Sequence, residues 1–440
     1  MSNIFFYPFT KFGDPLKKLT LVATAVMGLL SVSGAMAQST VTLYGLVDGG
    51  YNYVSGLRQG SVNTIASGIM EGSRFGMRGS EDIGGGYKAI FTLENRFELD
   101  TGSVSNRPNS GTQVPDRVNT TILASLASQG LPGAASLAPG VTVASLAGQL
   151  TTGLAGSAFG VNLSGNLFDR QAFAGLVTPF GAFTLGRQYT PGFLVNAAFD
   201  ASQTQSSLAA GQVASLPAAF DIRLSNTLQY GIQTGGITAA LMYGAGEVAG
   251  NSSAGRFLGA MAIYKGNGFS VGFAHNERKN EFGQKSLTNN VLGANVVIGP
   301  GTLYGQYATI KDDNPSNLSP LFASVPLPVR AQYQTAFNSA FRQDARLMHI
   351  GYKFISGVHT IVTAFNRLDD KRAVNADTDS YGVTYTYALS KRTNLNAVLT
   401  RFNNKGAGQI APGGNGFLGG VTASAGTDAT NVAFGIRHTF

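Results

Sequence analysis

The chain contains no cysteine and no tryptophan, and charged residues make up only 12% of its 440 residues. The absence of cysteine excludes disulfides, thiol chemistry and zinc–thiolate sites. Typical soluble domains are about 25% charged, so this chain is unusually uncharged for a soluble protein of its size. Its basic excess, a formal net charge of +8, is scattered and forms no Lys/Arg run of the kind that binds nucleic acid.

Long apolar runs are also missing, apart from one near the amino terminus. Lys17 and Lys18 precede an apolar stretch over 19–32, and the small residues of "AMA" at 35–37 are those that a signal peptidase reads. This pattern predicts a secretory signal peptide over 1–37 and a mature domain over 38–440. Beyond Gln38 no apolar stretch approaches the roughly 20 residues that a transmembrane helix needs.

Alternation of apolar and polar residues is the main signal in the mature chain. In "SYGVTYTYAL" the large residues Tyr381, Val383, Tyr385, Tyr387 and Leu389 all fall on one face of a strand. The same period of two recurs in sixteen segments, each near the 9 to 11 residues of a tilted membrane strand. Export, low charge and this alternation together predict a β-barrel of the outer-membrane type.

The connections between these segments fall into two alternating kinds. Tight turns such as "QTGG" at 233–236 and "KGNG" at 265–268 alternate with long polar loops such as 100–166 and 190–221. We therefore predict an all-β fold: a 16-stranded antiparallel transmembrane β-barrel with short periplasmic turns and long extracellular loops. Because lipid cannot satisfy an open sheet edge, the terminal "NVAFGIRHTF" should pair with "VTLYGLVDG". A barrel of this width encloses an aqueous channel.

One long loop is unusual in composition. The inserted loop spans 100–166. Residues 118–168, which make up most of it and the two residues that follow, carry no charge and are rich in Ala, Leu, Ser and Gly. Their length predicts a functional or partly disordered loop and not a core element.

Several segments resemble the general diffusion porins of Gram-negative bacteria, of the β-proteobacterial and neisserial type. The matches are "VTLYGLVDGGY", "SRFGMRGSEDIGGGYKAIFTLENRFEL", "RQAFAGLVTPFGAFTLGRQYTP", "YALSKRTNL" and "GIRHTF". The resemblance implies a homotrimer in the outer membrane, surrounded by lipid and lipopolysaccharide, that passes small hydrophilic solutes and ions by passive diffusion. It also implies that the assembly machinery reads the terminal stripe Phe440, His438, Ile436 and Phe434.

In that family a loop folds into the barrel and faces a basic wall. The resemblance places Arg74, Arg170 and Arg223 on this wall, and strand parity adds Arg78 beside Arg74. The constriction loop would be 190–221, in which Asp200 and Asp221 are the acids. With more arginines than carboxylates the constriction should be net positive, which predicts a mild preference for anions. The alternative is that the arginines pair with Glu94, Glu98 or Asp48 and leave little selectivity.

Arg187 shares the parity of the apolar Phe183 and Leu185, which would turn a charge toward lipid at a cost of roughly 2–4 kcal/mol. We therefore expect Arg187 to face a subunit interface. Two other functions remain open: a surface adhesin or receptor that works through 118–168, and a barrel hydrolase. The four scattered histidines form no metal or catalytic motif, so we expect no enzyme, no cofactor and no metal.

Overall fold

The computed structural model describes residues 40–440 except 112, 159, 215–220 and 414–418. The predicted signal peptide over 1–37 lies outside the described residues. Among the described residues, no helix is long and apolar enough to cross a membrane.

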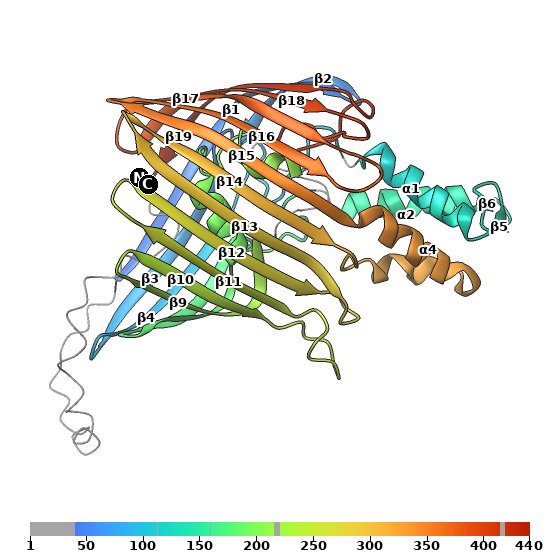
Figure 1. Cartoon of the computed structure of the whole chain (residues 1–440), viewed down its shortest axis with the longest axis horizontal. Helices are drawn as coiled ribbons and strands as arrows, with labels where there is room; N and C mark the ends of the chain where they lie inside the picture. The colour runs from blue at the N-terminus through green and yellow to red at the C-terminus, as the bar shows by residue number, and fades with distance from the viewer. Residues whose placement is uncertain (1–39, 112, 159, 215–220, 414–418) are drawn as a thin grey trace, which may run out of the picture.

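The described chain forms a closed antiparallel barrel, seen from the side in Figure 1. Its strands are β1 (Thr40–Leu57), β2 (Gly60–Ser67), β3 (Arg74–Gly84), β4 (Tyr87–Arg96), β7 (Gln171–Thr178), β8 (Gly181–Tyr189), β9 (Arg223–Thr234), β10 (Ile237–Gly244), β11 (Phe257–Lys265), β12 (Phe269–Lys279), β13 (Lys285–Ile298), β14 (Gly301–Asp312), β15 (Gln343–Ser356), β16 (His359–Asp370), β17 (Thr378–Ala388), β18 (Thr393–Asn404) and β19 (Ala429–Thr439). Since β2 and β3 both pair with β1, they form two halves of one wall strand. The barrel therefore has the 16 strands that the sequence predicts.

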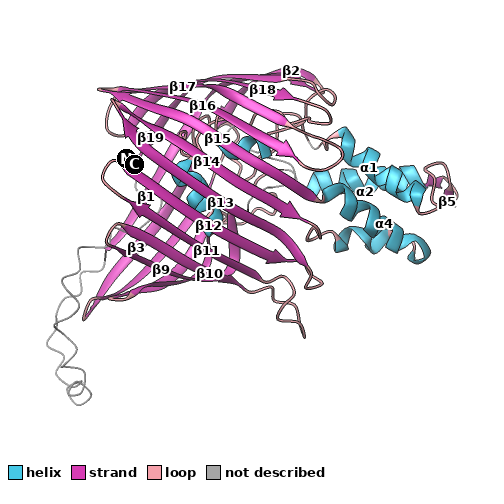
Figure 2. Cartoon of the chain, in the orientation of Figure 1, coloured by secondary structure: helices cyan, strands magenta, loops and turns pink. Residues whose placement is uncertain are grey.

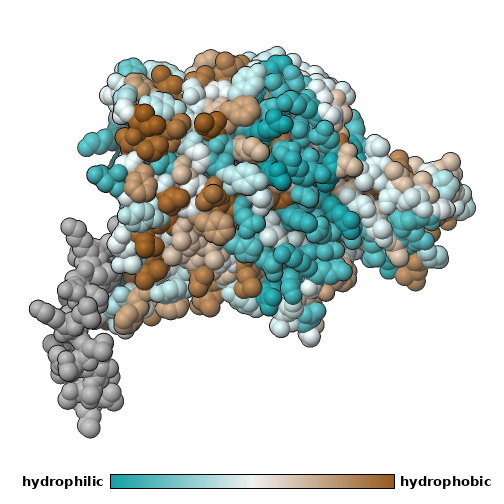
Figure 3. All heavy atoms as spheres, in the orientation of Figure 1, coloured by the Kyte–Doolittle hydropathy of each residue, from teal (hydrophilic) through white to brown (hydrophobic). Residues whose placement is uncertain are grey.

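The alternation in the sequence places apolar side chains on the outside of the barrel and polar side chains inside it, the reverse of a soluble protein. Along β18, Leu395 and Leu399 are exposed on the outer face, while Asn396 and Thr400 are buried in the interior. Figure 3 shows hydrophobic side chains gathered over the half of the barrel that holds the chain ends, and a hydrophilic zone next to the projecting helices. An apolar outer band with a polar interior is the arrangement that a lipid bilayer requires.

The two kinds of connection lie at opposite ends of the barrel. At the periplasmic end, β9 and β10 are joined by Gly235 and Gly236, whose φ angles of 55° and 82° fit the type I′ turn that tight hairpins favour. The long loops gather at the other end, from which helices project in Figures 1 and 2. The predicted division into short turns and long loops is confirmed.

The first and last strands close the barrel. β1 pairs with β19 from Leu46 opposite Thr439 to Val54 opposite Asn431. Gly45 and Phe440 then exchange both backbone hydrogen bonds, at 3.2 and 3.1 Å. The terminal segment is therefore the closing strand, as its apolar stripe predicts.

The uncharged insertion, predicted as a functional or partly disordered loop, contains helices whose positions the sequence did not indicate. It forms α1 (Asp116–Ser128), β5 (Ser136–Ala138), β6 (Val141–Thr142) and α2 (Val143–Ala158), which pack with η3 (Ser319–Ser324) and α4 (Leu327–Phe341) of a distant loop. Val118, Ile122 and Leu126 line one face of α1 and are fully packed in this separate core. Helices form here because two loops more than 150 residues apart bury each other's apolar faces.

Candidate functional site

A long loop after β8 folds into the barrel and narrows it. It begins with α3 (Pro191–Phe199), where Thr190 caps the backbone N–H of Phe193 and Pro191 occupies the first turn, as helix starts favour. The ring of Phe199 lies against Gly272 and Gly293 of β12 and β13, where an added Cβ would come within 2.6 and 2.4 Å of that ring. These glycines let the helix lie flat against the inner wall.

The rest of the loop is fastened to the next part of the wall. The hydroxyl of Ser207 contacts Thr400 Oγ1 at 2.9 Å and Asn431 Oδ1 at 2.7 Å. Asn366 donates to the carbonyl of Leu208, and the N–H of Ala201 donates to His349 Nε2 at 2.9 Å. The short helix η2 (Ala210–Ala214) packs on β15–β17.

The loop therefore covers one side of the interior. Its α3 lies mainly against β10–β14 and its η2 against β15–β17. The opposite wall, formed by β3, β4 and β7–β9, carries the predicted arginines. A solute that passes the loop must pass this wall.

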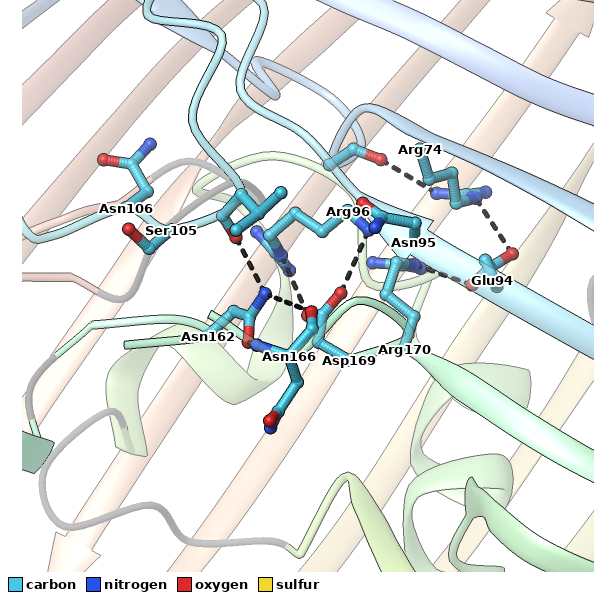
Figure 4. A network of polar contacts seen from close by, with 12 residues as sticks. Arg74, Glu94, Asn95, Arg96, Ser105, Asn106, Asn162, Asn166, Asp169 and Arg170 are labelled. Carbon is cyan, nitrogen blue, oxygen red and sulfur yellow. Dashed lines mark hydrogen bonds and ion pairs between the residues drawn. The ribbon is translucent and has the colours of Figure 1, made fainter. Parts of the chain in front are cut away.

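Three of the four predicted basic residues come together on that wall. Arg170, just before β7, donates from Nε to Glu94 Oε1 at 2.7 Å, and Arg74 Nε lies 3.6 Å from Glu94 Oε2. Figure 4 shows these three side chains converging from neighbouring strands. Arg223 begins β9 and lies opposite Tyr189 in the sheet, so the cluster spans five consecutive strands of the wall.

Tyr189 joins Arg223 to this group. Its hydroxyl oxygen accepts hydrogen bonds from Arg223 Nη2 at 2.7 Å and from Arg170 Nη2 at 3.2 Å. The guanidinium of Arg223 also lies 4.4 Å from the centre of the Tyr189 ring, in a cation–π contact. Within the described part of the chain no carboxylate lies within 4.0 Å of Arg223.

Arg78 extends the group along β3. It is exposed, and its guanidinium lies 5.3 Å from the centre of the Tyr44 ring. Tyr44 in turn donates its hydroxyl proton to Glu94 Oε2 at 3.1 Å. We call Arg74, Arg78, Arg170 and Arg223 with Glu94, Tyr44 and Tyr189 the arginine cluster.

The predicted acids of the loop bond elsewhere. Asp200 is fully buried, and its carboxylate accepts from Ser202 N and Oγ and from Ala210 N at 2.8–3.0 Å. Asp221 pairs with Arg278 at 3.1 Å. The structure therefore brings neither carboxylate into contact with the arginine cluster, and their role in the constriction stays a prediction.

Of the three acids that could instead pair with the predicted arginines (Glu94, Glu98 and Asp48), only Glu94 does so. Asp48 instead accepts three backbone hydrogen bonds, from Ile69 and Met70 at 3.0 Å and from Glu71 at 2.8 Å. These bonds hold 68–73, the break between β2 and β3, inside the barrel. Glu98 pairs with a different arginine, Arg96, at 3.4 Å.

Three further ion pairs were missed by sequence reasoning. Arg96 also lies 3.5 Å from Asp169, next to the arginine cluster (Figure 4). Glu71 contacts Arg437 at 2.6 Å and Arg74 at 3.5 Å. The interior parity of Arg437 in the terminal strand was a usable signal, whereas Glu71 lies in the break, where no alternation locates it.

Arg187 lies at an irregularity in the sheet. The register of β8 against β9 shifts between Gly186 and Gln188, and the Arg187 side chain donates to Asp169 O at 2.5 Å and to Ser225 Oγ at 3.1 Å. These intrachain bonds satisfy part of its hydrogen-bonding capacity. Its expected position at a subunit interface stays a prediction.

The predicted assembly stripe lies on the outer face of β19. Phe434, Ile436 and Phe440 are exposed there, and His438 contacts Thr393 Oγ1 at 2.8 Å. Recognition of this stripe by assembly machinery is not tested by the structure and stays a prediction.

Comparison with known proteins identifies the family to which this barrel is similar. A family model described as Gram-negative porin matches residues 23–407. Outer membrane porin protein 32 of Delftia acidovorans is 26% identical over 446 residues, which cover 96% of this chain and all of that protein.

Solved structures share the fold. The anion-selective porin from Comamonas acidovorans matches with a TM-score of 0.64 at 23% identity, over 92% of this chain and 100% of the other. The trimer form of OmpT of Vibrio cholerae matches with a TM-score of 0.55 at 12% identity, over 91% and 99%. A surface adhesin finds no support in these comparisons.

Proposed function

This chain belongs to the Gram-negative porin family and is an outer-membrane channel for passive diffusion of small solutes, and from that premise we propose that it prefers anions. The arginine cluster carries the proposal, because its four guanidinium groups outnumber the carboxylates that pair with them: Glu94 pairs with Arg74 and Arg170, Glu71 pairs with Arg74, and Arg78 and Arg223 lie over tyrosine rings. A structurally similar porin from Comamonas acidovorans is described as anion-selective.

The size of the preference follows from the charges. Two unit charges about 5 Å apart in water interact with about 0.8 kcal/mol, which changes a local ion concentration roughly fourfold. Glu94 offsets one arginine, and Glu71 is itself shared between Arg74 and Arg437. The preference should therefore be mild, and it favours anions because the excess charge is positive.

The reversal potential of single channels in a salt gradient tests the proposal. We expect the anion-selective sign in dilute KCl. The preference should weaken toward 1 M salt, where the Debye length falls to about 3 Å. A cation-selective sign in dilute salt would contradict the proposal, and a preference that does not change with salt would show that exposed charge is not its origin.

We further propose that the chain assembles as a homotrimer in outer-membrane lipid and lipopolysaccharide. The trimer form of OmpT, which shares the fold, supports this assembly. Outward-facing basic residues near the extracellular ends of the strands, such as the exposed Arg346 of β15, are suited to anionic lipid headgroups.

Arg187→Leu tests the proposed interface role of that arginine. If a neighbouring subunit contacts its guanidinium, the variant trimer should dissociate at a lower temperature on heating in detergent than the native trimer. Arg346→Leu on β15 is the control, because it removes an exposed outer arginine from a different part of the wall. Equal dissociation temperatures for the native and Arg187→Leu trimers would place Arg187 outside the interface.

A further inference from the structure

A histidine lies buried between the constriction loop and the barrel wall. His349 is on the inward face of β15, directly opposite Gln306 of β14 and Asn366 of β16, and its side chain has no exposed surface. The loop covers it at Ala201. Histidine is the side chain that ordinarily changes its charge between pH 5 and pH 8. The arginine cluster lies on the opposite wall, so this residue has no part in it.

The hydrogen bonds of His349 hold its ring in the neutral form. Nε2 lies 2.9 Å from the backbone nitrogen of Ala201. Because a backbone N–H can only donate, Nε2 is the acceptor and carries no proton. Nδ1 lies 2.6 Å from Asn366 Oδ1. The amide nitrogen of Asn366 donates to Leu208 O and to Ser380 Oγ, both at 3.0 Å, so its oxygen accepts and Nδ1 of the histidine donates.

The histidine and Asn366 hold the two ends of a strained segment of the loop, residues 201–208. Within this segment Gln203, Thr204 and Ser206 have φ angles of 56°, 62° and 59°. This is the left-handed region, which residues other than glycine rarely adopt. Such a conformation persists only where the surrounding bonds impose it. Loss of one attachment should therefore let the segment relax.

A buried carboxylate beside the histidine bonds to the same segment. Asp200 Oδ1 lies 3.9 Å from His349 Nε2, and both side chains are fully buried. Oδ1 accepts from N and Oγ of Ser202 at 2.9 and 2.8 Å, and Oδ2 accepts from the N–H of Thr204 at 3.2 Å. The carboxylate therefore helps to impose the strained conformation and lies within a short movement of the ring.

The other groups that face this site are neutral or bond elsewhere. The side chains opposite the histidine on β14 and β16 are the uncharged amides of Gln306 and Asn366. Tyr304 of β14 interacts with Asp200. Lys353, further along the inward face of β15, donates to the loop at 2.8 Å. Among the described residues, Asp200 is therefore the acid placed to receive a charge on the histidine.

We propose that His349 attaches the constriction loop to the wall only while its ring is neutral, so that acid releases the loop and lowers the conductance of the channel. A proton on Nε2 turns this atom into a donor that faces the N–H of Ala201, and the bond between them is lost. The new N–H is attracted to Asp200 Oδ1, which gives up its bonds to Ser202 to accept it. The segment 201–208 then relaxes toward the channel, because the wall blocks movement the other way.

Single-channel conductance at two pH values tests this proposal. The native conductance should fall roughly twofold between pH 7.5 and pH 5.0, the range over which histidine takes up its second proton. Recording in 1 M KCl, where the Debye length is about 3 Å, limits the direct effect of the added charge on ion flow. The inference goes beyond the proposed anion preference and does not depend on it, because a narrower channel carries less current of either ion.

His349→Gln keeps an oxygen that can accept from the N–H of Ala201 and takes up no proton in this range. It should conduct as the native channel does at pH 7.5 and show no fall at pH 5.0. His359→Gln is the matched control, since it replaces an exposed histidine on the outer face of β16, and it should keep the native fall. A fall of native size in His349→Gln would overturn the proposal.

A proline at the attachment point separates the bond from the charge. The N–H of Gln203 donates to Asp200 O at 2.8 Å, so 200–203 form a turn in which residue 201 has the position that favours proline. Ala201→Pro therefore suits the turn while it removes the N–H that donates to His349.

Ala201→Pro should conduct at pH 7.5 as the native channel does at pH 5.0, and acid should lower its conductance no further. The shift in gel mobility on heating that folded barrels show confirms that each variant is folded. Native conductance of folded Ala201→Pro at pH 7.5 would show that this bond does not hold the loop, and would overturn the proposal.

Discussion

Replacing Arg74, Arg170 and Arg223 together by glutamine should reverse the channel's preference from anions to cations. The triple variant removes three positive charges and leaves Glu94 with only the distant Arg78 to offset it. At about 0.8 kcal/mol per charge at roughly 5 Å in water, the anion-to-cation permeability ratio should fall by an order of magnitude or more. The measurement is the reversal potential in a KCl gradient.

Two matched variants make this result specific. Lys391→Gln removes a positive charge from an exposed periplasmic turn and should leave the reversal potential unchanged. Adding Glu94→Gln to the triple variant should bring the preference back toward neutral, because the remaining carboxylate of the cluster is then gone. A triple variant that folds, conducts and still prefers anions would show that the arginine cluster does not set the selectivity.

Deleting Phe440 should lower the amount of barrel inserted in the outer membrane by about an order of magnitude while leaving the conductance of inserted channels unchanged. The deletion removes the last pair of bonds that closes the barrel, between Phe440 and Gly45. It also removes the aromatic end of the outward stripe on β19, which by resemblance is the assembly signal. An unpaired edge next to lipid costs several kcal/mol per group, so both effects act in one direction.

Two further variants separate the role of Phe440 in closing the barrel from its proposed role as a signal for the assembly machinery. Phe440→Tyr keeps an aromatic terminus and should insert normally. In Gly45→Val the new side chain meets the ring of Phe440, since a Cβ at Gly45 would lie 2.5 Å from it. This variant keeps the aromatic terminus and should refold poorly in detergent, and more poorly than the deletion variant, which loses one terminal pair of bonds without a clash. Normal insertion of the deletion variant in cells would contradict the prediction.

The outer wall was predictable because the membrane imposes a simple rule on it. A strand between lipid and water must place apolar residues at every second position. Strands such as β17 and β18 can therefore each be predicted from their own sequence, without knowledge of their neighbours. Closure also followed without a structure, since an open barrel edge is not viable in lipid. The pairing of β1 with β19 confirms this reasoning.

The helical projection was not predictable in the same way. α1 and α2 come from a segment without charge, and their apolar faces are covered by α4 from a different loop. Tyr333 of α4, for example, donates its hydroxyl proton to Val143 O at 2.8 Å. Short helices gain most of their stability from packing, and nothing local in 118–168 indicates which distant segment supplies that packing.

In the pore lining, the positions of some residues were predictable from the sequence and their partners were not. Strand parity and resemblance located Arg74, Arg78 and Arg223, because a wall residue's face is a local property. The partners were decided by the fold: Tyr189 lies beside two arginines, and Glu71 enters the interior only because Asp48 holds the break between β2 and β3. Asp200 lies in a loop, where strand parity gives no position for its side chain, and its carboxylate accepts hydrogen bonds from the backbone of that same loop.

The sequence by itself thus determined a 16-stranded barrel, its closure by the terminal strand and the side on which its basic residues lie. Tertiary structure alone decided which charges meet, how two loops build a helical projection, and how the constriction loop is held to the wall. The physical reason is one of range. A period of two is imposed on each strand by its own lipid and water, whereas ion pairs, loop packing and the attachment of the constriction loop depend on segments that are distant in sequence and adjacent only after folding.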